Sequence, residues 1–403
     1  MIKKISTKYL RAGMYIKDLN CSWLNHPFFG SSLKVRDDET VEKILKYGIR
    51  EVYIDTDKGL DVIETSLKQE LKKQTHEELT KIAERKLERN LKITVNKEIV
   101  KARKIKTETI RTIKKIMNDV KLGKPLERSM VEKDVDSITE SVFRNEDALM
   151  GLGRLRKINE YTYSHSMSVC VLMVSFTKHL GFEESLIREI GIGAILHDVG
   201  TSRIPADILK KKSTLTDEEY EMIKKHVQYG REIMEQTAGM SDISIITAYE
   251  HHERLDGSGY PNNLKGDEIS ILGQAMGIVD VYDALTTKRS YRGRTQPTEA
   301  LRMIYGWGGT RFNFSLVQEF IRCIGIYPVG TLVSLESGLL GVVINHGEED
   351  MLKPVVRIIY NTKNEKYITM PYDLDLADEG ENGDRIVNYE SPDKWNLQPE
   401  VYL

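Results

Sequence analysis

The sequence is poor in cysteine. Its 403 residues include three cysteines, Cys21, Cys170 and Cys323, which lie far apart and follow no paired spacing. A disulfide framework is therefore excluded, and a reducing compartment is indicated. Cys170 and Cys323 lie in apolar runs, so we expect both to be buried thiols.

Signals for secretion or membrane insertion are also missing. The longest clear apolar run, Val169–Val174, is far shorter than the roughly 20 residues of a membrane-spanning helix. Residues 1–15 lack the apolar core of a signal peptide. We therefore expect a cytoplasmic protein without a membrane span.

A charge excess of one sign is absent as well. The formal net charge is −2 although 30% of the residues are charged, so no global field directs the protein to nucleic acid or to an anionic membrane. Residues 97–115 carry eight Lys or Arg against two Glu, but no aromatic residues for base stacking alternate with them. This run indicates a solvated helix face, and we expect no nucleic acid polymer as a partner.

The length predicts two or three domains, each with its own core. Residues 1–60 are typical of a small α/β module: Gly13 turns the chain between two strand-like pieces, Val41–Tyr47 is a short helix, and Glu51–Asp55 is a strand. In residues 61–140, sparse apolar residues recur every three or four positions among Lys and Glu. This spacing predicts a charged amphipathic helical linker. Its narrow apolar stripe usually needs a partner helix, so we expect a homodimer formed through residues 61–140.

The remaining chain changes from helix to strand. Residues 141–330 show helical periodicity throughout and predict an all-α bundle, so the fold class is mainly α. Residues 331–403 begin with short alternating strands, which predict a small antiparallel β appendage packed on the bundle, followed by an acidic, peripheral tail from Asp373. The strands are expected at Thr331–Leu335, Gly341–Asn345, Pro354–Tyr360 and Lys366–Pro371.

Histidines carry the functional signal. Seven of the nine histidines lie between residues 165 and 346, and five of these stand on or at the ends of predicted bundle helices. A polar cluster inside a bundle is unfavourable unless a metal or hydrogen bonds satisfy it. Histidine with aspartate and without cysteine suits iron, manganese, zinc or nickel. The five are His165, His197, His226, His251 and His252.

The central stretch is HHERLDGSGYP at 251–261. Two adjacent histidines can reach one centre only from the edge of a helix, and the Gly-rich loop that follows provides such an edge. His197 and Asp198 also stand at a predicted helix end. Aspartate can bridge two cations, and a pair of cations serves phosphoryl transfer by activating a shared water.

Several of these segments together resemble the HD-GYP domain, a bacterial branch of the HD phosphohydrolase superfamily. Residues 1–60 also resemble the domain of unknown function that often precedes it. The resemblance implies a helical bundle with two or three metals that hydrolyses cyclic di-GMP to linear pGpG, and sometimes onward to GMP. The matching segments, which together span roughly residues 145–345, are YTYSHS at 161–166, LHDVGTSRIPADIL at 196–209, the helix with His226, HHERLDGSGYP at 251–261, VDVYDALTTKRSYR at 279–292 and IGIYPVG at 324–330.

The resemblance implies roles for individual residues. Asp198 would bridge two divalent metals, with iron or manganese favoured and zinc or nickel acceptable, and a metal-activated water would be the nucleophile. Asp283 would orient or deprotonate that water, or would be an ordinary supporting carboxylate. The metal ligands would be His165, His197, Asp198, His226, His251, His252 and Asp280.

Other positions would serve the substrate. Tyr260 would stack near a guanine or close the loop, and Arg289 and Arg292 would bind phosphate, for which the planar guanidinium is suited. The alternative for the two arginines is an ordinary surface helix end. Thr201, the remaining substrate-binding candidate, stands where the family usually has a lysine expected to contact the scissile phosphate. Loss of one such contact costs about 10²–10³ in rate. Arg203 is a candidate substitute.

A second departure concerns the metal count. Tyr161 stands where the trinuclear members of the family have a glutamate, so we expect two metals and a product that stops at the linear dinucleotide. Three functions remain open. The first is a cyclic di-GMP phosphodiesterase in bacterial signalling, the second a catalytically weak cyclic dinucleotide-binding effector, and the third a phosphodiesterase for 3′,3′-cyclic GMP-AMP.

Overall fold

The computed structural model forms two compact units, residues 1–78 and 79–403, which are described separately. The described residues are 2–19, 32–46, 49, 51–60, 92–153, 161–209, 211, 213–287, 295–346, 352–378 and 383–403.

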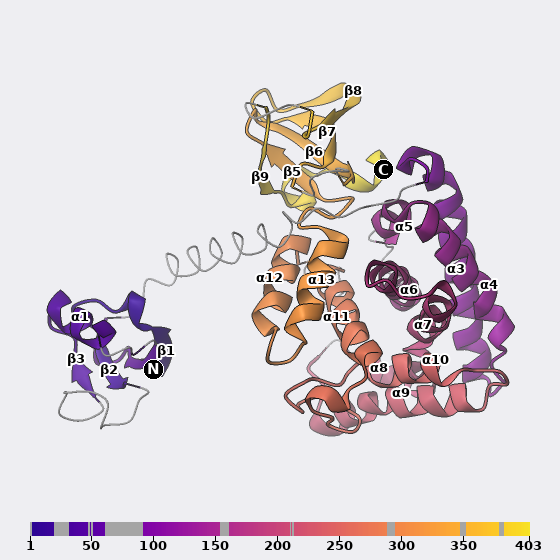
Figure 1. Cartoon of the computed structure of the whole chain (residues 1–403), viewed down its shortest axis with the longest axis horizontal. Coiled ribbons are helices and arrows are strands. Elements are labelled where there is room, and N and C mark those ends of the chain that lie inside the picture. The colour runs from indigo at the N-terminus through magenta and orange to yellow at the C-terminus, as the bar shows by residue number, and fades with distance from the viewer. Residues whose placement is uncertain are drawn as a thin grey trace. The chain divides into compact units, whose positions relative to one another are not determined.

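The first unit has a four-stranded antiparallel sheet with the order β1-β4-β2-β3 and one helix on it (Figure 1). Gly13 has a φ of 97° at the predicted turn, a backbone conformation that residues with a side chain rarely adopt. Alternating apolar residues such as Ile16, Val52 and Ile54 are fully buried and form its core with Ile44 of the helix. The elements are β1 Ile2–Ser6, β2 Tyr15–Asp18, β3 Leu33–Lys34, α1 Asp38–Lys46 and β4 Glu51–Asp55.

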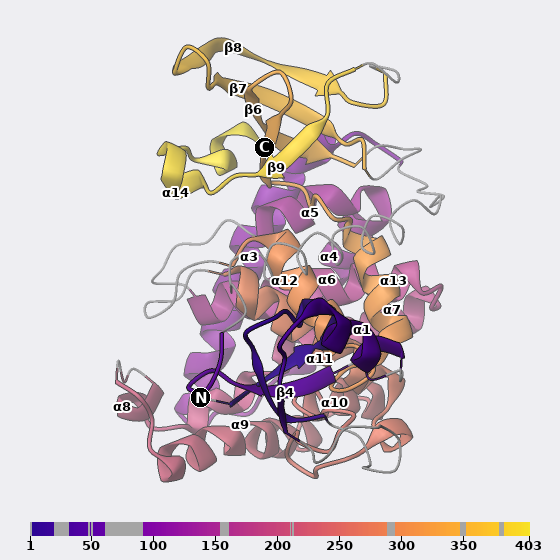
Figure 2. The ribbon, with the colours of Figure 1, turned by 90° about the vertical axis from the view of Figure 1, so that its left-hand side faces the viewer.

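The second unit is a helical bundle with a sheet at one end, as Figures 1 and 2 show. Helix α6 is buried on nearly every side from Ser164 to Thr177, so it is the central helix of the predicted all-α bundle. The helices are α3 Val95–Lys121, α4 Arg128–Arg144, α5 Glu146–Gly153, α6 Tyr161–His179, α7 Glu184–Leu196, η4 Val199–Arg203, α8 Ala206–Leu209, α9 Asp217–Glu235, α10 Asp242–Tyr249, η5 Gly266–Glu268, α11 Ile271–Thr286, α12 Pro297–Trp307 and α13 Phe314–Ile324.

Helices α3 and α4 belong to this bundle. Their buried residues, among them Ala102, Ile113 and Ile138, join the core that contains α6 and α7. The apolar face of α3 therefore packs on this chain's own α4, α5 and α6. The structure thus differs from the division at residue 141, because the bundle already begins by Val95. The apolar positions of residues 61–91, on which the homodimer prediction rests, lie outside the described residues.

The C-terminal sheet is antiparallel with the order β8-β7-β6-β5-β9. Val333, Val343 and Val356 on its inner face join the core of the bundle, as expected for an appendage packed on it. The segment predicted as a peripheral tail contributes β9, which pairs with β5 through Tyr389 and Val333. The elements are β5 Leu332–Leu335, β6 Leu339–Asn345, β7 Val355–Asn361, β8 Lys366–Asp375, β9 Ile386–Tyr389, α14 Pro392–Trp395 and η6 Pro399–Tyr402.

The structure also bears on two sequence predictions, that of buried cysteines and that of a chain without a membrane span. Cys170 and Cys323 are both buried, and neither forms a disulfide among the described residues. Among the described residues, no helix is both long and apolar enough to cross a membrane.

A buried ion pair fastens α3 to α4. Glu98 is 1% exposed and accepts hydrogen bonds from Arg144 Nε (2.9 Å), Arg144 Nη2 (2.8 Å) and Ser141 Oγ (2.7 Å). Burial raises the pKa of Glu98, but these hydrogen bonds outweigh burial and hold the pKa below its ordinary value. The pair therefore stabilises the fold while Glu98 is ionised.

Replacing Arg144 with alanine should lower the free energy of unfolding by about 3 kcal/mol, because an ionised Glu98 would remain buried without its cation. A depressed pKa contributes stability above the unfolded pKa, near 4.3, and loses it as the pH falls through the folded value. The deficit of Arg144→Ala should therefore shrink below about pH 4. Urea unfolding at two pH values measures both effects. Lys104→Ala removes an exposed pair with Glu108 and should change stability by less than about 0.5 kcal/mol. An equal deficit at both pH values would contradict the assignment.

Candidate metal centre

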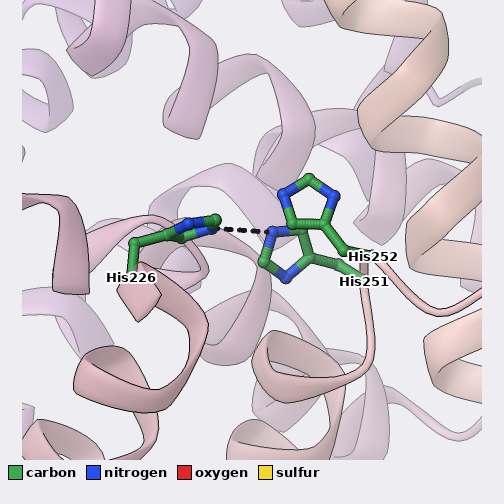
Figure 3. Close-up of side chains that lie close together, drawn as sticks. All are labelled: His226, His251 and His252. Carbon is green, nitrogen blue, oxygen red and sulfur yellow. Dashed lines mark hydrogen bonds between the residues drawn. The ribbon is translucent and has the colours of Figure 1, made fainter. Parts of the chain in front are cut away.

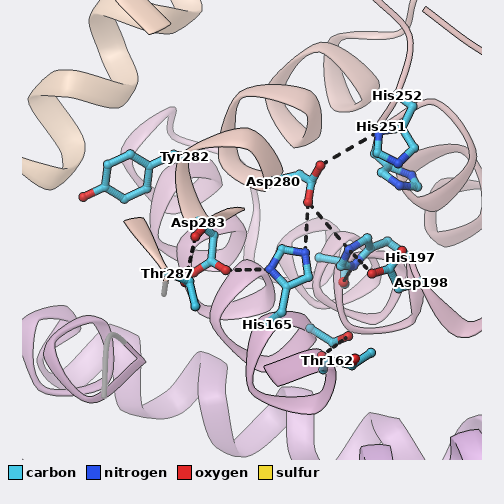
Figure 4. Close-up of polar contacts among 12 residues, drawn as sticks. Thr162, His165, His197, Asp198, His251, His252, Asp280, Tyr282, Asp283 and Thr287 are labelled. Carbon is cyan, nitrogen blue, oxygen red and sulfur yellow. Dashed lines mark hydrogen bonds and ion pairs between the residues drawn. The ribbon is translucent and has the colours of Figure 1, made fainter. Parts of the chain in front are cut away.

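Side chains that are far apart in the sequence meet at one place in the bundle (Figure 4). They fall into three overlapping groups whose ligand atoms lie within 4.8 Å of one another. All seven ligands named from the sequence take part. The groups are His165 with His197 and Asp280, His226 with His251 and His252, and His197 with Asp198 and His251.

Asp198 lies between two clusters of histidines. Its Oδ2 is 3.5 Å from His197 Nε2, and its Oδ1 is 3.4 Å from His226 Nε2. Each oxygen thus faces a different cluster, which is the arrangement expected of a bridging carboxylate. Asp280 closes the other side, with Oδ1 at 3.0 Å from His165 Nε2 and Oδ2 at 4.0 Å from His252 Nδ1.

Backbone carbonyls fix the direction of three imidazoles. In each, Nδ1–H donates to the carbonyl three residues earlier, which leaves Nε2 unprotonated and directed into the centre. Two of the three carbonyls lie in the last turn of a helix, where they have no helical partner. The pairs are His197 with Ala194 (2.8 Å), His226 with Ile223 (2.7 Å) and His251 with Ala248 (2.5 Å).

The arrangement of Nε2 atoms suits a cation. His226 Nε2 and His251 Nε2 are 3.5 Å apart (Figure 3), and both carry a lone pair because Nδ1 holds the proton. His197 Nε2 is buried and has no hydrogen-bond partner among the described residues. Buried acceptors that face one another are unfavourable without a shared cation or proton donor. The histidine and aspartate donors therefore fit divalent metal ions.

The pKa values of several of these side chains also favour metal binding. Burial, with repulsion from His197, lowers the pKa of His251 to about 3, and burial likewise holds the pKa of His252 well below its ordinary value. Burial raises the pKa of Asp198, but the neighbouring histidines outweigh it and bring the pKa to about 2. At neutral pH these side chains are thus two neutral imidazoles and a carboxylate, the protonation states that metal ligands need.

The centre is deep and opens on one side. His165, His197, His226 and His251 are at most 4% exposed. The side chains of Asp198 and His252 are 20% and 21% exposed. A substrate must therefore approach along the side formed by these two residues.

Asp283 occupies the place of a supporting carboxylate, the second of the two roles considered for it. Its Oδ2 is 2.6 Å from Nδ1 of His165, while Nε2 of the same ring faces Asp280. Asp283 therefore lies behind the imidazole, so it orients His165 rather than a water in the centre. Burial lowers the pKa of His165, but hydrogen bonds to Asp280 and Asp283 outweigh it and raise the pKa to about 9.

Replacing Asp283 with alanine should weaken metal binding by about 10- to 100-fold, because His165 loses the partner that fixes its tautomer and orientation. Competition with a fluorescent chelator measures this affinity. Asp267→Ala, at an exposed position of η5, is the control and should leave the affinity unchanged. An unaltered affinity in Asp283→Ala would show that His165 needs no such support.

The predicted substrate residues have varied surroundings. Tyr260 stacks on His252, with ring centroids 4.5 Å apart. Thr201 lies in η4, and its hydroxyl donates to the carbonyl of Asp198 (2.7 Å). Arg203, the candidate substitute for the absent lysine, forms an ion pair with Glu232 at 2.9 Å. Arg289 and Arg292 lie outside the described residues, as does Glu160, and the side chain of Tyr161 is likewise not described.

One residue of the central stretch has a role that the sequence analysis did not assign. Glu253 is 3% exposed and accepts hydrogen bonds from the backbone of Asn262 (2.7 Å) and Leu264 (3.0 Å). It thereby closes the Gly-rich loop and holds Tyr260 against His252. The only signal for this role in the sequence was an acidic residue beside a loop of turn formers.

Comparison with known proteins agrees with this fold and site. A family model described as "HD domain" matches residues 146–316, and "Domain of unknown function (DUF3391)" matches residues 2–131. The chain is 32% identical over 401 residues to cyclic di-GMP phosphodiesterase PA4108 of Pseudomonas aeruginosa, covering 99% of this chain and 94% of that protein. The chain therefore belongs to the HD-domain proteins, in their HD-GYP branch.

Two further relatives match a smaller part. The chain is 34% identical over 173 residues to a cyclic di-GMP phosphodiesterase of Thermotoga maritima, covering 42% of this chain and 47% of that protein. It is 36% identical over 162 residues to 3′3′-cGAMP-specific phosphodiesterase 2 of Vibrio cholerae, covering 40% of this chain and 31% of that protein. The relatives' names thus include both cyclic dinucleotides considered from the sequence.

Proposed function

We propose that this protein is a metal-dependent phosphodiesterase that hydrolyses cyclic di-GMP to linear pGpG. The observation that carries the proposal is the position of Asp198, whose two carboxylate oxygens each face a different histidine cluster. The similarity to PA4108 along nearly the whole chain supports the choice of substrate. The scattered cysteines support a cytoplasmic location, in which bacterial second messengers act.

Two divalent cations, iron or manganese by preference, fit the two clusters. His165, His197 and Asp280 would hold one, His226, His251 and His252 would hold the other, and Asp198 would be shared. When bound, such a pair lowers the pKa of a shared water and neutralises charge on the phosphoryl group. The protein's own part is to keep His251 and His252 neutral, and to orient His165 through Asp283. It also fixes tautomers by binding Nδ1 of His197, His226 and His251 to backbone carbonyls.

The test is product analysis with the metal-loaded protein. Cyclic di-GMP incubated with protein reconstituted with Mn²⁺ or Fe²⁺ should give pGpG without further GMP, and elemental analysis should find two metals per chain. Competition with 3′,3′-cyclic GMP-AMP in the same reaction ranks the two substrates. Absence of any linear product with every metal, while the dinucleotide still binds, would refute the phosphodiesterase function.

A catalytically weak cyclic dinucleotide effector is the second candidate. The observation in its favour is Thr201, whose hydroxyl is engaged with the Asp198 carbonyl, together with the pairing of Arg203 to Glu232. Neither side chain supplies a free cation to the phosphate. If this deficit limits turnover, Thr201→Lys should raise the rate by about 10²–10³. A rate that stays within about threefold would mean that another cation already serves the phosphate.

A further inference from the structure

The metal pair can neutralise only one of the two phosphodiesters of the substrate. A cyclic dinucleotide has two phosphodiesters on opposite sides of its macrocycle, and only the scissile one can lie at the bridging carboxylate. The second phosphodiester remains charged at every physiological pH, so a cation near the open side of the centre would contribute to binding.

Lys224 on α9 is positioned to serve as that cation. The centre opens beside His252, Tyr260 stacks on His252 at 4.5 Å, and Lys224 Nζ lies 5.6 Å from the centroid of the Tyr260 ring. The same Nζ lies 4.9 Å from the ring of Tyr220, whose side chain is exposed. Nζ of Lys224 therefore lies within cation–π distance of two aromatic rings, one of which, Tyr260, contacts the candidate ligand His252.

A phosphate of the substrate can replace the carboxylate that now pairs with Lys224. Its partner is Glu221, with Oε1 at 2.6 Å, and the Glu221 side chain is 64% exposed. An exposed pair three residues apart on a helix contributes little, so a phosphate can displace the carboxylate at small cost. Two other cations near the centre are less available among the described residues, which do not include Arg289 and Arg292. Arg254 donates to the carbonyls of His251 and Glu253, and Arg203 pairs with Glu232.

We propose that Lys224 binds the second, non-scissile phosphodiester of the cyclic dinucleotide, beside the Tyr260 ring that contacts His252. The proposal rests on the proposed function, because it assigns a subsite to that substrate. Lys224 and the candidate ligand His226 lie on the same helix, α9. This helix therefore fixes the distance between the subsite for the second phosphodiester and the metal centre.

The test compares two substrates that differ in the second phosphodiester. Lys224→Met should raise KM for cyclic di-GMP about 10- to 100-fold with little change in kcat, because a charge-assisted contact is lost in both ground and transition states. Bis(p-nitrophenyl) phosphate has a single phosphodiester, so its KM should change less than about threefold. Binding of the phosphorothioate analogue of cyclic di-GMP, measured by calorimetry, should weaken by the same factor as KM rises.

Matched variants separate charge from structure. Lys225→Met, at the exposed neighbouring position, should leave both substrates unaffected, and Lys224→Arg should restore most of the affinity. Glu221→Gln should lower KM for cyclic di-GMP, because it removes the competing carboxylate. An unchanged KM in Lys224→Met, or equal losses on both substrates, would overturn the subsite while leaving the proposed function intact. If the unmodified protein neither binds nor cleaves the dinucleotide, the proposed function fails and the subsite fails with it.

Discussion

Asp198→Asn is expected to lower turnover of cyclic di-GMP by at least about 10³-fold. The carboxylate presents one oxygen to each histidine cluster, at 3.5 Å from His197 Nε2 and 3.4 Å from His226 Nε2. An amide of the same shape retains one acceptor and loses the negative charge, so it cannot be shared by two cations. A loss of several kcal/mol of charge stabilisation in the transition state corresponds to this factor.

Two measurements check this result together. Single-turnover rates with saturating Mn²⁺ give the loss of activity, and elemental analysis should show the metal content falling from two per chain to one or fewer. Asp207→Asn, at an exposed position of α8, provides a control that should keep both quantities. If Asp198→Asn keeps two metals per chain and its turnover stays within tenfold of that of the unmodified protein, Asp198 does not bridge the metals.

Gly200→Ala is expected to disrupt the centre without changing any ligand. A Cβ at residue 200 would lie 2.0 Å from the carbonyl oxygen of His226 and 2.4 Å from the amide nitrogen of Gly230. Both atoms belong to the backbone of α9, so no side chain can move aside. Segment η4 would have to separate from α9, which takes Asp198 away from His226.

The expected loss for Gly200→Ala is about 3 kcal/mol in the free energy of unfolding, as overpacking against backbone implies. Metal affinity should also fall by about 100-fold. Moving η4 away from α9 displaces Asp198, and a displaced ligand binds metal as weakly as one that has lost the residue that orients it. Thermal unfolding and chelator competition measure the two effects. Gly306→Ala is the matched control, because a Cβ there has no atom within 4 Å, and it should be neutral or slightly stabilising.

The two predictions test different parts of the argument. Asp198→Asn changes the chemistry of a ligand and preserves the packing around it. Gly200→Ala preserves every ligand and changes only the distance between two backbone segments. If both lose metal while the control variants keep it, the centre depends on the carboxylate and on the close contact of η4 with α9.

The candidate ligands could be named from the sequence because two signals agreed. Histidine and aspartate without cysteine at helix ends indicated a metal, and the order of HD and HHERLDGSGYP segments indicated the family, whose resemblance implied the individual ligands. The all-α bundle was predicted from the helical periodicity of residues 141–330.

Other features followed from packing and had no local signature. The sequence placed α3 in a helical linker, because periodicity cannot say which surface an amphipathic helix packs on; Ile113 of α3 lies in the core of the bundle. Strand β9 pairs with β5 in a segment whose acidic composition suggested a tail. The position of Asp283 behind His165 likewise required coordinates, because one helical turn from Asp280 is compatible with either face of the imidazole.

The sequence by itself determined the kind of chemistry, since the donor atoms are properties of the side chains and do not depend on where they meet. The tertiary structure decided which atom of each donor is available. Backbone carbonyls take Nδ1 of His197, His226 and His251, so Nε2 is left for the centre. It also decided that Asp198 faces both clusters and that Lys224 stands beside the open side, because those relations depend on how α7, α9 and α10 pack.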